Sequence, residues 1–106
     1  MFRPKIEIRV FENRMRVTSL ETGKAIERAA DIPFSSARML VADTDSARNL
    51  LNAICMDLEG RRRWLAWPTA IFRPMELCPD GLSAVEKAAI VKMLEGLGFA
   101  KVEFAA

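Results

Sequence analysis

Residues 5–20 alternate between apolar and polar side chains with a period of two. In residues 5–11 every second residue is isoleucine or valine, and the residues between them are mostly charged. Residues 14–20 repeat the pattern after a short polar turn at Glu12 and Asn13. Successive side chains of a strand point to opposite faces of a sheet, so this spacing predicts a β-hairpin with one buried face.

Two later segments carry apolar residues at the spacing of an α-helix. In the first, which stops at Gly60, the stripe consists of Ala47, Leu50, Leu51, Ile54 and Leu58. In the second, it consists of Val85, Ala89, Ile90, Met93, Leu94 and Leu97. We expect Asp45 or Ser46 to cap the first helix. We expect Ser83 and Glu86 to form a capping box at the start of the second.

Three further segments complete the expected sheet: residues 26–32, an edge strand ended by Pro33, then residues 74–78 and residues 101–106. Residues 61–74 are interpreted as a loop or short extended piece, because Pro68 would remove a hydrogen-bond donor from a central strand. The order is strand, strand, strand, helix, strand, helix, strand. It predicts an α+β fold with a five-stranded mixed sheet, in which right-handed crossovers place both helices on one face.

The same order is used by the ribonuclease-H-like and actin-like folds, and part of the sequence resembles one actin-like family. Residues 79–90 hold a proline–aspartate–glycine turn and then the capping box, and residues 96–102 hold two glycines before a strand. Both motifs, together with Phe-Arg-Pro at residues 72–74, resemble motifs of bacterial MreB that are separated by the same spacing. Residues 41–43 resemble that family more weakly. The resemblance implies one degenerate actin-like subdomain over residues 1–106.

The chain departs from this family where nucleotide would bind. The family's first phosphate loop should fall at residues 9–15, where Arg9 replaces the acidic residue that organises magnesium and no glycine allows the backbone to cradle a phosphate. The family's second phosphate loop and second domain have no counterpart in this sequence. We therefore expect no nucleotide and no other cofactor. Glu86, which matches the glutamate that positions the attacking water, would have no phosphate to act on.

Residues 61–72 are the most unusual stretch, with three arginines beside two tryptophans. Such residues could contact a membrane surface or a protein, stack on single-stranded nucleic acid, or cover the core. In the MreB family the segment before the Arg-Pro strand is a membrane-inserting loop, and Ile71 and Phe72 match that position. The candidate interaction residues are Arg61, Arg62, Arg63, Trp64, Trp67, Ile71 and Phe72.

Composition excludes several kinds of catalysis. The 106 residues contain no histidine, so a nucleophile activated by an imidazole base is excluded and the commonest metal ligand is missing. The two cysteines, Cys55 and Cys78, lie in apolar runs and are expected to be small core residues. A net charge of +2 is too small to indicate nucleic-acid binding by itself.

Three hypotheses of function follow. The first is a non-enzymatic module, located in the cytoplasm, that binds a protein partner, for example a cell-shape filament protein, or itself. The second is a peripheral binder of anionic membranes at the inner membrane face, which would use the segment from Arg61 to Phe72 for weak contact. The third is a small enzyme using carboxylates such as Glu7 or Glu12, although paired arginines make these residues more typical of a solvated sheet face. We expect neither metal nor nucleic acid to be bound.

Overall fold

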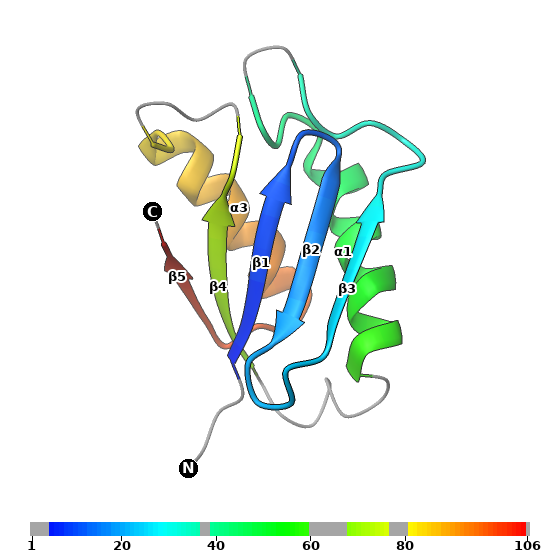
Figure 1. Cartoon of the computed structure of the whole chain (residues 1–106). Coiled ribbons are helices and arrows are strands. Elements are labelled where there is room, and N and C mark those ends of the chain that lie inside the picture. Colours follow the sequence, from blue (N-terminus) through cyan, green and yellow to red (C-terminus); the bar gives the residue numbers. More distant parts are fainter. Residues whose placement is uncertain (1–4, 37–38, 60–67, 77–80, 106) are drawn as a thin grey trace.

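The computed structural model contains one mixed sheet of five strands (Figure 1), and it describes residues 5–36, 39–59, 68–76 and 81–105. The strands are β1 (Lys5–Phe11), β2 (Arg14–Ser19), β3 (Ala25–Ala29), β4 (Thr69–Pro74) and β5 (Lys101–Phe104). Their order across the sheet is β3-β2-β1-β4-β5. β1, β2 and β3 form an antiparallel meander, β4 runs parallel to β1, and β5 runs parallel to β4. The predicted fold class is confirmed.

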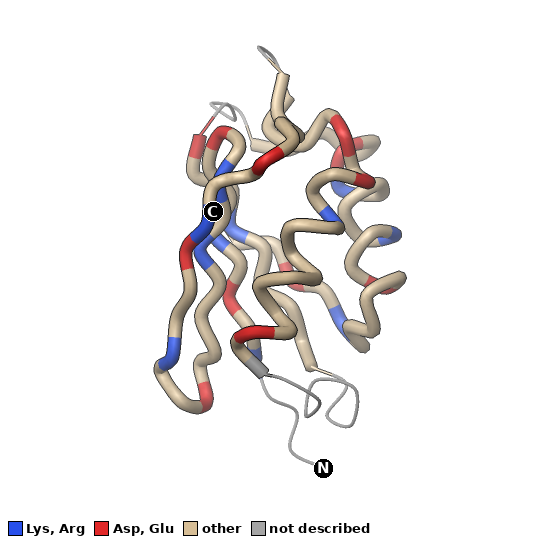
Figure 2. The backbone as a smooth tube through the Cα atoms, turned by 90° about the vertical axis from the view of Figure 1, so that its right-hand side faces the viewer, with Lys and Arg blue, Asp and Glu red and all other residues tan. Residues whose placement is uncertain are grey.

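Helices α1 (Thr44–Glu59) and α3 (Ala84–Gly96) lie on the same side of the sheet, as Figure 2 shows. α1 connects β3 to β4 and α3 connects β4 to β5, and the two strands of each pair run in the same direction. Right-handed crossovers in the same direction put both helices on one face. Between sheet and helices lies a core of fully buried side chains, the largest of which are Phe34, Phe72, Ile6, Ile8, Met15, Leu40, Leu51, Ile54, Ile90 and Leu94. Cys55 is buried in this core as expected, whereas Cys78 lies outside the described residues.

The fourth strand is where the sequence prediction was wrong. β4 begins at Thr69, within the stretch interpreted as a loop, and ends at Pro74, where the strand was expected to start. Pro68 directly precedes the strand, so its missing N–H removes no bond from the β4 ladder, and its carbonyl still accepts from the Ala100 amide at 3.0 Å. Residues 77–80 lie outside the described residues.

The edge strands are shorter than predicted. β3 ends at Ala29 instead of residue 32, because its pairing partner in that register is Arg14, the first residue of β2. β5 ends at Phe104, which pairs with Phe72 of β4.

The helix caps agree with expectation at one helix and differ at the other. Ser83 and Glu86 form the predicted capping box of α3. At α1, however, Asp43 is the capping residue: its carboxylate accepts bonds from the Ser46 amide at 3.1 Å and from the Ser46 hydroxyl at 2.8 Å. These bonds, the amide bond first, lower the pKa of Asp43 below its ordinary value.

The apolar stripe predicted for α3 is too wide. The buried residues of helix α3 are Ile90, Met93 and Leu94, whereas the Val85 side chain is 78% exposed. At about 100° per residue, Val85 lies roughly 140° around the helix axis from Ile90, so it faces away from the core.

Candidate interaction surface

The face of the sheet opposite the helices is not covered by any helix or strand of the described chain (Figure 2). Every second residue of β1 is buried against the helices, so the residues between them point to the other side. The same alternation and the pairing register extend this surface over all five strands. We call it the open face. Its larger side chains are Lys5, Glu7, Arg9, Phe11, Arg14, Arg16, Glu27, Ile71, Arg73, Lys101 and Glu103.

The open face holds a surplus of positive charge. Six basic and three acidic side chains lie on it, which gives +3, whereas the whole chain carries +2. The rest of the chain therefore carries a net charge of −1. The net charge of +2, which by itself does not indicate a function, therefore results from a positively charged open face and a slightly negative remainder.

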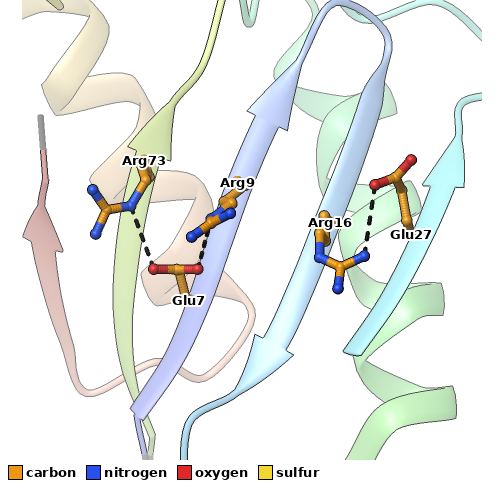
Figure 3. Close-up of polar contacts among 5 residues, drawn as sticks. All are labelled: Glu7, Arg9, Arg16, Glu27 and Arg73. Atoms are coloured by element: carbon orange, nitrogen blue, oxygen red, sulfur yellow. Dashed lines mark hydrogen bonds and ion pairs between the residues drawn. The ribbon is translucent and has the colours of Figure 1, made fainter. Parts of the chain in front are cut away.

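Glu7 lies at the centre of one cluster on this face. Its carboxylate oxygens lie 2.8 Å from Nε of Arg9 and 3.3 Å from Nε of Arg73, so one anion bridges two cations from neighbouring strands (Figure 3). The Glu7 side chain is only 13% exposed, while both arginines are more accessible. This arrangement screens the carboxylate from solvent and leaves the guanidinium groups at the surface.

A second cluster lies on β2 and β3. Glu27 is 3.6 Å from Arg14 and 3.9 Å from Arg16, and all three side chains are well exposed. Pairs this long and this exposed contribute little to stability. Both clusters thus have two arginines for one glutamate, and the second can exchange its partners at small cost. The Glu7–Arg9 pair lies on this sheet face as the sequence indicated, whereas Arg14 pairs with Glu27 across the strands.

The turn between β1 and β2 lies within residues 9–15, where the sequence resemblance led us to look for a phosphate loop. The Glu12 amide donates to the Glu76 carboxylate at 2.9 Å, and the Asn13 amide donates to the Ser35 hydroxyl at 3.0 Å. Backbone amides of this kind could hold a phosphate, but here they bind side chains of the chain itself. The Glu76 carboxylate also places negative charge beside the turn.

Asn13 is a residue whose importance the sequence analysis missed. Its φ of 53° is in the left-handed region, and its side-chain oxygen accepts bonds from the Phe34 and Ser35 amides at 2.8 and 2.7 Å. It therefore attaches the segment after β3 to the hairpin turn. An asparagine in a two-residue turn between alternating runs favours the left-handed conformation, and that signal was present in the sequence.

The predicted interaction segment is only partly visible. Arg61, Arg62, Arg63, Trp64 and Trp67 lie outside the described residues. Ile71 is half-buried and lies on the open face, next to Glu7 on β1. Phe72 requires a correction: it points to the opposite side of β4 and is fully buried against Ile8 and Phe104, so its side chain is not available to a partner.

Other candidate chemistry finds no support in the part of the chain that is described. The Glu86 carboxylate accepts a hydrogen bond from the Ser83 amide at 3.2 Å, as part of the capping box of α3. The described residues contain no group of three or more side chains suited to hold a metal ion. Among the helices described, none has the length and apolar character needed to cross a bilayer.

The strand order, the two parallel crossovers and the single helical layer give the chain the fold of an actin-like subdomain. In particular, the chain is similar to MreB5 of Spiroplasma citri bound to ADP, with a TM-score of 0.65 at 15% identity, and to the same protein bound to AMPPNP, with a TM-score of 0.63 at 13% identity. Each comparison covers 98% of this chain and 38% of the MreB5 chain. No family model matches, and no curated protein matches in sequence. The likeness confirms the MreB-like fold expected from the motifs.

Proposed function

We propose that this chain is a non-enzymatic interaction module: an actin-like subdomain that binds an acidic protein partner through the open face and does not bind nucleotide. The observation that carries the proposal is the surplus of three positive charges on an uncovered sheet face of a chain whose total charge is +2.

The charge distribution favours an acidic partner over a second copy of the chain. Two open faces brought together would oppose like charges, which is unfavourable in an interface. An acidic surface would meet the arginines around Glu7 and Glu27 and raise the rate of association. Ile71 supplies apolar contact near the middle of the same face, so it remains part of the proposed site.

The turn between β1 and β2 supports the absence of nucleotide binding. The amides of Glu12 and Asn13 already donate to Glu76 and Ser35. A phosphate would have to displace these acceptors and lie close to the Glu76 carboxylate. Arg9, at the position of the family's magnesium-organising residue, instead pairs with Glu7 on the open face.

Affinity capture with charge-reversed variants tests the partner. The double variant Arg16→Glu with Lys101→Glu reverses two exposed charges of the open face. The matched control, Arg48→Glu with Lys92→Glu, makes the same change in charge on the two helices. Proteins retained by the wild type and the control, and lost from the open-face variant, would be partners of this surface. If the three proteins retain the same set, the open face is not the binding site.

Two further measurements separate the other hypotheses. Calorimetry with Mg-ATP should give no binding tighter than about 1 mM, and tighter binding would contradict the loss of nucleotide binding. Sedimentation with phosphatidylserine-containing vesicles tests the membrane hypothesis. Co-sedimentation that is lost on changing Arg61, Arg62 and Arg63 to alanine, with an unchanged melting temperature, would support membrane contact through that segment in place of a protein partner.

A further inference from the structure

β3 is an edge strand of the sheet in the described part of the chain, and the backbone N–H and C=O groups of every second residue point away from β2. The Ala30 amide donates to the Asn13 carbonyl and the Ser19 amide donates to the Lys24 carbonyl, both at 2.8 Å. In an antiparallel pair, even-numbered residues of β3 therefore direct their N–H and C=O groups toward β2. The backbone groups of the odd-numbered residues point away from the sheet: these are Ala25, Glu27 and Ala29. They form a template for one more strand.

A groove runs beside this edge, between the end of β3 and helix α1, which passes behind it in Figure 1. Its volume is about 300 Å³, and its apolar lining comes from Ala29, Ala30, Ile32, Leu50 and Ala53. Ile32 is 67% exposed, which is unusual for an isoleucine. The ion pair of Arg28 with Asp57 links β3 to α1 further along the helix.

We propose that an extended peptide segment of another protein adds to β3 as a sixth strand and inserts alternate apolar side chains into the groove between β3 and α1. The outward backbone groups of β3 would supply main-chain hydrogen bonds, and the groove would supply selectivity for side chains. The inference concerns the edge of the sheet, where Glu27 also belongs to the open face, and it does not depend on the proposed function.

Charge argues against a second copy of the chain as the occupant. Antiparallel pairing of two β3 strands centred on Glu27 would place this residue opposite itself. If one strand is shifted by two residues in one direction, Arg28 lies opposite Arg28 of the other copy. If it is shifted by two residues in the other direction, Lys24 lies opposite Arg28. Like charges directly opposite each other destabilise a sheet, so the three registers that pair most of the outward groups are disfavoured.

The same reasoning defines the peptide. The residue opposite Glu27 would lie on the open-face side of the sheet, where lysine or arginine complements the carboxylate. The residue opposite Ala30, three positions away along the peptide, would point to the other side, where valine or isoleucine fits between Ala30 and Leu50. The expected core of the ligand is therefore an extended segment with a basic and an apolar residue three positions apart.

Selection from a phage-displayed library of random peptides about ten residues long, on the immobilised full chain, tests this proposal. Two variants of exposed residues on α1 distinguish the groove from the rest of the helix. Ala53→Gln fills the groove, whereas Met56→Gln changes an exposed side chain outside it. Selected peptides should carry a basic and an apolar residue three positions apart. They should bind the Met56→Gln variant like the wild type and the Ala53→Gln variant at least about tenfold more weakly.

Amide hydrogen exchange gives a second readout that only strand addition would produce. Without peptide, the amides of Ala25, Glu27 and Ala29 should exchange quickly, and with a selected peptide all three should become protected. The proposal is overturned if no peptide is enriched, if Ala53→Gln binds as well as the wild type, or if protection appears elsewhere. Protection of the three amides that rises with protein concentration in the absence of peptide would also overturn it, in favour of a second copy.

Discussion

Replacing Asn13 by alanine should strongly destabilise the chain, because this residue shapes the turn between β1 and β2 and attaches a second segment to it. The side-chain oxygen accepts the Phe34 and Ser35 amides at 2.8 and 2.7 Å, and the residue has a φ of 53°. Alanine removes the acceptor from two part-buried amides and also disfavours the left-handed backbone. The segment after β3, which brings Phe34 into the core, would then lose its attachment to the hairpin.

The magnitude follows from these two losses. A buried donor left without a partner costs about 1–3 kcal/mol, and water can reach these part-buried amides, so we take about 1 kcal/mol for each. The left-handed conformation costs alanine about 1 kcal/mol more. The sum, about 3 kcal/mol, is a large part of the 5–15 kcal/mol typical of a domain. It corresponds to a fall in melting temperature of roughly 10–20 °C for a chain of this size.

Urea and thermal denaturation followed by circular dichroism would measure the loss, with two variants as controls. Asn13→Gly keeps the backbone conformation but not the acceptor, so it should lose about 2 kcal/mol. Asn13→Asp keeps both the acceptor and the tolerance of positive φ, so it should remain within about 1 kcal/mol of the wild type. The reasoning is refuted if Asn13→Ala lies within about 0.5 kcal/mol of the wild type, or if Asn13→Asp is equally destabilised.

Three other substitutions test the caps and the core. Because hydrogen bonds lower the pKa of Asp43, its stabilising effect should be complete well above its ordinary pKa and disappear as the pH falls through the lowered value. The melting temperature of Asp43→Ala should thus differ from the wild type at pH 7 and converge with it near pH 2; an equal difference at both would contradict this. Ser83→Ala should cost about 1 kcal/mol in urea denaturation, and no loss would argue against the capping box. Phe72→Ala should cost about 3–5 kcal/mol, against less than about 1 kcal/mol for Ile71→Ala on the open face. Equal losses at these two positions would contradict the assignment of Phe72 to the core.

The sequence by itself determined the elements whose signals are local. The hairpin of residues 5–20 was predictable because alternation expresses the two faces of a strand, and both helices were predictable because their buried residues recur at helical spacing. The capping box of Ser83 and Glu86 was predictable because its bonds join residues three apart. The same turn-and-cap motif, with the order of elements, was enough to indicate the MreB-like fold.

Only the tertiary structure decided the position of β4, the burial of Phe72 and the clusters of the open face. Residues 69–74 become a strand because β1 and β5 lie on either side of them, and no local pattern carries that information. Glu7 and Arg73 are 66 positions apart in the chain and meet because parallel pairing places β4 beside β1. The net charge of +2 likewise conceals a surface with +3, since composition records how many charges a chain has and only the fold decides which face they share.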